Sequence, residues 1–143
     1  MQRRTFIQQG CLACAAAFAA PALLASCSSA RTIAGTVEGD DLVLPANSFA
    51  GKDGAPIKYI IATHPQLMQP IAVFKQEQGY SAVLMRCTHK GVELRMAGEN
   101  LECSAHGSSF DRTGAVLEGP ASVPLRKLPV VERDGRIHLS LKA

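Results

Sequence analysis

The sequence predicts an all-β protein, an antiparallel sandwich or a small barrel built from short strands. Apolar and polar residues alternate in several short runs, and glycine with aspartate or proline separates one run from the next. After residue 32, no segment carries apolar residues at a convincing helical period. The chain has 143 residues, which is the length of one domain, so a single folded domain is expected.

Six runs are expected to form strands. In chain order they span residues 41–44, 57–63, 71–75, 80–86, 127–131 and 136–142. The last run alternates most strictly, with Ile137, Leu139 and Leu141 on one face. The same alternation places His138 on the opposite face of the strand, where we expect it to contact water.

The first 26 residues are expected to be an export signal rather than part of the fold. Arg3 and Arg4 precede an apolar run of small side chains, and this arrangement resembles a twin-arginine (Tat) signal peptide. The run from residue 11 to residue 26 has 16 residues, which is shorter than the ~20 residues that a membrane span needs. The sequence Leu-Ala-Ser-Cys at 24–27 resembles a bacterial lipobox, which implies cleavage before Cys27 and acylation of that cysteine.

These resemblances divide the chain into three parts. Residues 1–26 are the expected signal peptide, 27–32 a short polar tether and 33–143 the folded domain. The implied location is the periplasmic side of a bacterial cell envelope, with membrane contact through a lipid anchor at Cys27.

The charge of the part after the signal is nearly balanced. Residues 1–26 carry two arginines and no acid, so the rest of the chain has 13 basic and 12 acidic side chains. A net charge of +1 argues against a nucleic-acid partner, because such surfaces are strongly basic.

Two short segments each supply one cysteine and one histidine, Cys87-x-His89 and Cys103-x-x-His106. Thiolate and imidazole together suit zinc, or iron in an iron–sulfur cluster. A zinc ion would take all four side chains in one Cys2His2 tetrahedron. In zinc fingers, however, both cysteines precede both histidines, whereas here each segment holds one of each.

The spacing resembles the signature of the Rieske family, C-x-H followed by C-x-x-H, which holds a [2Fe–2S] cluster. The resemblance implies that Cys87 and Cys103 bind one iron and that His89 and His106 bind the other. It also implies that the hydroxyl of Ser108 donates a hydrogen bond to a bridging sulfide. Residues 119–125 resemble the proline loop that covers the cluster, and the implied fold is a Rieske-type antiparallel β-sandwich with a small cluster-binding subdomain.

Three residues depart from the pattern of Rieske proteins in respiratory quinol-oxidising complexes. Val92 and Ala105 stand where those proteins carry two disulfide-bonded cysteines, so packing and backbone hydrogen bonds must hold the loops here. Phe110 stands where they carry a tyrosine that donates to a sulfur atom. The loss of one donor is expected to lower the reduction potential.

The resemblance implies one-electron transfer, with one Rieske-type cluster per subunit, rather than a stand-alone catalyst. We expect an exported electron-transfer protein, free or as the small subunit of a larger oxidoreductase, with redox proteins as donor and acceptor. Two alternatives are the iron–sulfur subunit of a quinol–cytochrome c reductase and a structural zinc domain.

Other candidate residues have simpler interpretations. His64 is expected in a surface loop, and Asp111 in a turn rather than in a catalytic role. Arg86 and Lys90 flank the first ligand segment and either guide an anionic partner or are solvated charges near a turn.

Overall fold

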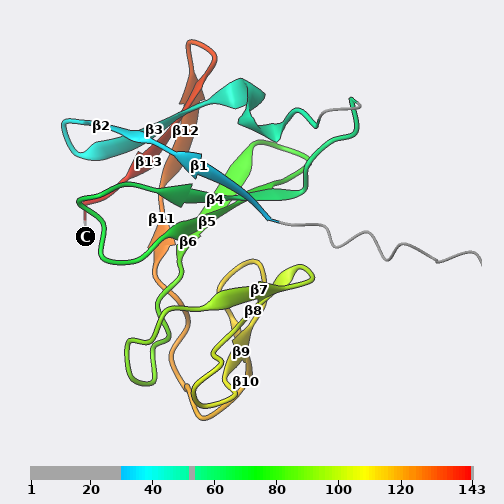
Figure 1. The fold of residues 1–143 in the computed structure, drawn as a ribbon, viewed down its shortest axis with the longest axis vertical. Helices are drawn as coiled ribbons and strands as arrows, with labels where there is room; N and C mark the ends of the chain where they lie inside the picture. The colour runs from blue at the N-terminus through cyan, green and yellow to red at the C-terminus, as the bar shows by residue number, and fades with distance from the viewer. Residues whose placement is uncertain (1–29, 52–53, 143) are drawn as a thin grey trace, which may run out of the picture.

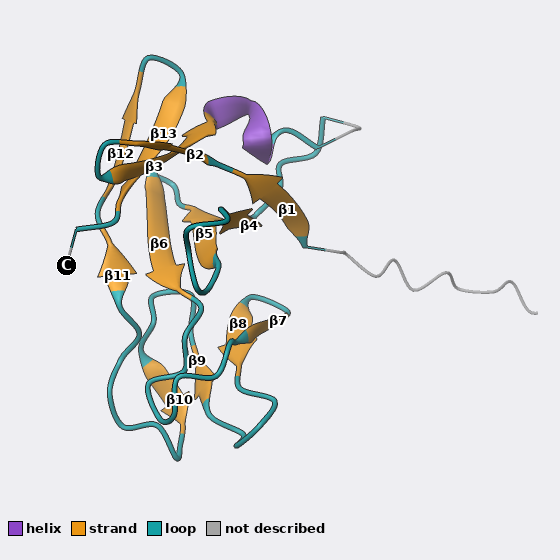
Figure 2. Ribbon diagram, turned by 60° about the vertical axis from the view of Figure 1, so that its left-hand side comes forward, coloured by secondary structure: helices purple, strands orange, loops and turns teal. Residues whose placement is uncertain are grey.

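The computed structural model describes residues 30–51 and 54–142, which form a larger part with two β-sheets and a smaller part below it (Figures 1 and 2). The predicted signal peptide and Cys27 lie outside the described residues. Among the residues described, helical structure is limited to the short 3-10 turn η2 (Ala46–Phe49), and no helix is long and apolar enough to cross a membrane.

The larger part contains a five-stranded sheet in the order β1-β4-β5-β6-β11 and a four-stranded sheet in the order β12-β13-β3-β2. The first sheet comprises β1 (Arg31–Ala34), β4 (Tyr59–Thr63), β5 (Ile71–Lys75), β6 (Tyr80–Leu84) and β11 (Lys127–Leu128). The second comprises β2 (Thr36–Glu38), β3 (Asp41–Pro45), β12 (Val130–Arg133) and β13 (Arg136–Ser140). All neighbouring strands are antiparallel except β1 and β4, which are parallel.

Alternating apolar residues of both sheets form the main core. In the pair β13–β3, Ile137 lies opposite Leu44 and Leu139 opposite Leu42, and all four side chains are fully buried. Each such side chain contributes roughly 1.5–3 kcal/mol by leaving water. The all-β prediction is therefore confirmed, and its physical basis is the alternation read from the sequence.

The smaller part is inserted between β6 and β11. It contains the sheet β10-β9-β8-β7, made of β7 (Arg95–Ala97), β8 (Asn100–Glu102), β9 (Ser109–Phe110) and β10 (Val116–Glu118). The two ends of the insertion meet, because Lys127 pairs with Val83 and the Leu84 N–H donates to the Arg126 carbonyl at 2.9 Å. A second apolar cluster, which includes Met85, Leu94, Leu101 and Phe110, fills this part.

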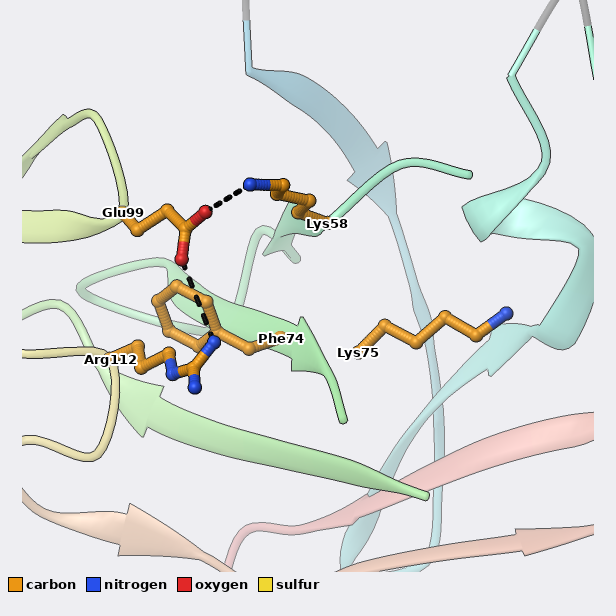
Figure 3. Close-up of a pocket in the computed structure, with 5 residues that line it drawn as sticks. All are labelled: Lys58, Phe74, Lys75, Glu99 and Arg112. Atoms are coloured by element: carbon orange, nitrogen blue, oxygen red, sulfur yellow. Dashed lines mark hydrogen bonds and ion pairs between the residues drawn. The ribbon is translucent and has the colours of Figure 1, made fainter. Parts of the chain in front are cut away.

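One ion pair, between Lys58 and Glu99, also joins the two parts. Glu99, in the turn between β7 and β8, accepts a hydrogen bond from Lys58 of the larger part and lies 3.6 Å from Nη1 of Arg112. Figure 3 shows the Glu99 carboxylate between these two cations, whereas Lys75 points away from it. The Lys58 hydrogen bond is the main cause of a pKa of Glu99 below its ordinary value.

Two strand predictions differ from the structure in informative ways. The expected strand 127–131 is divided into β11 and β12, because Pro129 has no N–H to donate to a ladder. Strand β1 begins at Arg31, so the last two residues of the expected tether pair with Ile60 and Ile61 in the sheet.

The prediction that His138 faces water is wrong. Its side chain is 6% exposed, and Nη2 of Arg133 lies 3.1 Å from its Nδ1. Asp41 adds a carboxylate oxygen 3.5 Å from the same nitrogen. Strand β13 lies between β12 and β3, and polar side chains from both neighbours, Arg133 and Asp41, cover the face that alternation assigns to solvent.

Candidate metal centre

The four predicted ligands lie in two loops of the smaller part, and the two loops have the same pattern of backbone hydrogen bonds. In loop 1 (residues 87–92) the Cys87 N–H donates to the Val92 carbonyl and the Gly91 N–H donates to the Cys87 carbonyl, both at 2.8 Å. In loop 2 (residues 103–108) the Cys103 N–H donates to the Ser108 carbonyl at 2.8 Å, and the Gly107 N–H donates to the Cys103 carbonyl at 2.9 Å. Each cysteine therefore opens a loop that closes on its own backbone.

Glycine is required where each loop turns back. Gly91 has φ +74° and Gly107 has φ +79°, a left-handed conformation that strains most other residues. Just outside the loops, Arg86 pairs with Glu93 and Glu102 pairs with Ser109. Both loops are thus tips of β-hairpins.

The two histidines occupy different positions within these two similar loops. His89 is the third residue of loop 1, whereas His106 is the fourth residue of loop 2. Their rings nevertheless meet edge to face, with centroids 4.8 Å apart and an interplanar angle of 87°. His106 is exposed and His89 is half-buried, so the imidazole pair lies at the surface.

The cysteines lie deeper than the histidines. Cys87 is 1% exposed and Cys103 is 2% exposed, and both thiols are free. Burial alone would raise the pKa of the Cys103 thiol, but hydrogen bonds from the backbone N–H groups of His106 and Ala105 and from the Cys87 thiol outweigh it. The pKa of Cys103 is therefore lowered, which favours the thiolate that binds metals.

A covering loop (residues 119–125) contacts both ligand loops. The Ala121 N–H donates to the hydroxyl oxygen of Ser108 at 3.0 Å, and Ser108 is fully buried. On the other side, the Thr88 hydroxyl donates to the Val123 carbonyl at 2.6 Å. Since the Ser108 oxygen accepts this bond, its own proton is available for a second acceptor.

The donor set fits a dinuclear iron–sulfur group. In the described part of the chain, Nδ1 of His89 is buried without a hydrogen-bond partner, as expected of a nitrogen positioned for a metal. Two thiols lie inside and two imidazoles outside, and a Rieske cluster uses such pairs on separate irons. Across residues 30–51 and 54–142, no three His, Cys, Asp or Glu side chains are arranged around one metal position.

The remaining predicted residues lie as follows. Phe110 is fully buried in β9, Val92 is half-buried and Ala105 is exposed. The His64 ring accepts the Gln66 N–H at 3.2 Å, which stabilises a turn.

Asp111 forms the expected turn. Its Oδ1 accepts hydrogen bonds from the Thr113 N–H, the Thr113 hydroxyl and the Ala115 N–H at 2.7–3.0 Å. Burial raises the pKa of Asp111, but these hydrogen bonds outweigh it, so the pKa lies below its ordinary value.

Sequence reasoning missed Thr88 and Arg126. The only sequence signal for Thr88 is its place between two predicted ligands. Arg126 lines a pocket together with His89 but carries no sequence signal, because it lies far along the chain from both ligand segments.

Several known proteins are similar to this chain. Residues 36–129 match the family profile described as Rieske [2Fe-2S] domain. The chain is 36% identical over 76 residues, 50% of its length, to the 3-phenylpropionate/cinnamic acid dioxygenase ferredoxin subunit of Photorhabdus laumondii, of which this covers 72%. It is 33% identical over 63 residues, 43% of its length, to the cytochrome b6-f complex iron-sulfur subunit of Chlorobaculum tepidum, of which this covers only 35%.

Among solved structures, the plasma membrane Rieske protein PetC3 of Synechocystis PCC 6803 is similar in fold. The TM-score is 0.50 with 28% sequence identity, and the match covers 58% of this chain and 86% of that one.

Proposed function

The chain belongs to the Rieske [2Fe–2S] family, and on that premise we propose that it is an exported protein that transfers single electrons between redox proteins. Membership in the family implies a Rieske-type [2Fe–2S] cluster as its cofactor. When bound, this cluster supplies reversible one-electron storage, which needs no substrate pocket.

We assign Cys87 and Cys103 to one iron and His89 and His106 to the other. The observation that carries this assignment is the matched pair of loops, which brings two buried thiols and two surface imidazoles together. Buried thiols keep water from the sulfur side, and an exposed His106 offers a short path to a partner.

Ser108 is proposed to donate its proton to a cluster sulfur. Its oxygen already accepts the Ala121 N–H, which orients the hydroxyl and leaves one proton to donate. A donor to sulfur stabilises the extra negative charge of the reduced state and raises the potential.

Two roles in a larger redox system are considered. The favoured role is a free carrier or the small subunit of an oxidoreductase, and the similarity to a ferredoxin subunit supports it. The similarity to a cytochrome b6-f iron–sulfur subunit supports the alternative of the iron–sulfur subunit of a quinol–cytochrome c reductase. Val92, Ala105 and Phe110 argue against that alternative, because they replace the disulfide and the tyrosine expected there.

We also propose that residues 1–26 are a Tat-type signal, that Cys27 carries a lipid and that the folded domain faces the periplasm. The support is the twin arginine and the lipobox-like sequence before Cys27. The similar protein from Synechocystis is a plasma membrane protein, which is consistent with a membrane-associated location.

The test is the metal content and redox behaviour of protein purified after export. We expect about two irons and two acid-labile sulfides per chain, an EPR signal after dithionite reduction, and a potential between about −150 and +300 mV. Cys87→Ser and Cys103→Ser should each lose the cluster, whereas Ser104→Ala should keep it. Colourless protein with one zinc per chain would instead support the structural zinc domain.

A further inference from the structure

An open pocket of about 590 Å³ lies beside loop 1, on the side of His89. Its lining comes from loop 1, the end of β6 and the covering loop, and it includes His89 and the exposed Val123. The pocket therefore borders one of the two imidazoles of the proposed cluster site.

The charged residues that line this pocket are all basic. Arg86, Lys90 and Arg126 line it, and no aspartate or glutamate does. Glu93 pairs with Arg86 through the backbone, but it lines a different pocket together with Met68 and forms no ion pair with Arg86. Within the described ranges, none of the three cations forms an ion pair, although seven other pairs are present there.

Two of the three cations are held in place. A Cβ atom at Gly91 would lie 3.1 Å from Nε and Nη2 of Arg86, so the guanidinium packs directly on the backbone of loop 1. Nη2 of Arg126 donates to the carbonyls of Leu141 and Lys142 at 2.7 and 2.8 Å. Positioned charges bind a partner with less loss of side-chain entropy than free ones.

We propose that this surface, named the cationic face (Arg86, Lys90 and Arg126), docks an acidic patch of the redox partner next to His89. Aspartate and glutamate side chains suit it because a guanidinium binds carboxylate through paired hydrogen bonds. The chain after the signal has nearly equal numbers of acids and bases, so the attraction is local to this face.

The proposal rests on the proposed function, because docking matters only if an electron is exchanged there. In the docked pair, one electron leaves the reduced protein and one acceptor centre gains it. No bond breaks or forms in this step.

The first test measures electron exchange with small oxidants of opposite charge. The reduced full-length protein is mixed with hexacyanoferrate(III), an anion, or with tris(phenanthroline)cobalt(III), a cation, at increasing ionic strength. We expect the rate constant for the anion to fall on the order of tenfold with salt, and that for the cation to stay level or rise. Equal salt dependence for both oxidants would overturn the proposal.

Matched variants distinguish the effect of charges on the cationic face from the effect of the overall charge of the protein. Arg86→Gln and Lys90→Gln each remove one charge at the face, and Lys75→Gln removes one elsewhere. Lys75 pairs with Tyr80 at the start of β6, about 20 Å of extended chain from Arg86. The first two variants should slow the anionic oxidant severalfold without slowing the cationic one, and Lys75→Gln should change neither; an equal effect of Lys75→Gln would overturn the proposal.

A binding measurement provides a readout that needs no electron transfer. Calorimetric titration with a hexaglutamate peptide should give weaker binding to Lys90→Gln than to the unmodified protein, and hexalysine should not bind. Equal hexaglutamate affinity in both proteins would contradict the proposal. Binding to phosphatidylglycerol vesicles without binding to hexaglutamate would overturn the proposal, because the cationic face would then bind an anionic membrane instead of a protein.

The outcomes also separate this proposal from the proposed function. Purified protein without iron would contradict the proposed function, whereas hexaglutamate binding would still test whether the cationic face binds acidic side chains. A loaded cluster with no charge discrimination would end the docking proposal alone.

Discussion

At the scale of single residues, Ser108 connects loop 2 to the covering loop through one oxygen atom. Ser108→Ala removes the proposed donor to sulfur, and we expect the midpoint potential to fall by about 40–90 mV, equivalent to about 1–2 kcal/mol. The substitution also leaves the buried Ala121 N–H without its acceptor, which should destabilise the fold by about 1–3 kcal/mol.

Protein-film voltammetry and thermal unfolding measure both effects. The neighbouring Ser109→Ala is the control, because Ser109 is only half-buried. An unchanged potential with lower stability would assign Ser108 a purely structural role.

Phe110 offers the opposite change at a fully buried position. Phe110→Tyr adds a hydroxyl that should raise the potential if it donates to a cysteine sulfur, by an amount similar to that of Ser108. Voltammetry of the variant tests this expectation. A hydroxyl that finds no acceptor should instead leave the potential unchanged and lower the stability by about 1–3 kcal/mol.

At the scale of elements, the covering loop depends on hydrogen bonds to two ligand loops. Thr88→Val removes the bond to the Val123 carbonyl while keeping the shape of the side chain. A loss of about 1 kcal/mol should open the loop about fivefold more often and speed cluster loss to a chelator by a similar factor. The decay of visible absorbance measures this rate, with Ser104→Ala as the control; equal rates would show that the bond does not restrain the loop.

The turn after β9 should make stability depend on pH through Asp111. Its folded pKa is lowered, so the stabilisation is complete above the unfolded value of about 3.9 and is lost as pH falls through the folded pKa. Asp111→Ala should therefore cost about 1–2 kcal/mol at pH 7, and the difference should shrink below about pH 4. Urea unfolding at both pH values tests this, and a difference independent of pH would contradict it.

The predicted strands with a strong apolar signal are present, and β5 has the predicted bounds. The short strands β7 to β10 were not predicted, because two or three residues contain no measurable alternation. His138 was wrongly expected to face water. Alternation in one strand shows which residues share a sheet face, but it contains no information on the side chains of neighbouring strands that cover the other face.

The residues of the candidate site came from two short motifs in the sequence. Ligand spacing identified the two cysteines and two histidines, and the resemblance to the Rieske family implied Ser108. The structure brings their loops together, while the role of each residue stays a prediction. Thr88 and Arg126 could not be found in this way, since their contacts join segments more than 14 residues apart.

At the scale of the whole molecule, the predicted export signal and lipid anchor can be tested directly. Replacing Arg3 and Arg4 with lysine should leave precursor of full mass in the cytoplasm. Cys27→Ser should prevent lipid attachment and move the exported protein from the membrane fraction to the soluble fraction. Intact-mass spectrometry of each fraction checks both expectations, and a mature chain that does not begin at Cys27 would contradict the lipobox interpretation.

If Cys27 carries the proposed lipid, the parallel pairing of β1 with β4 has a mechanical consequence. Strand β1 is the first described strand, and its four residues, from Arg31 to Ala34, pair with β4 along their whole length. A force applied at the N-terminal end of β1 would act along the strand. The hydrogen bonds between β1 and β4 would then be loaded together in shear, instead of breaking one after another. A strand loaded in this way would keep the domain folded while its N-terminal end is pulled.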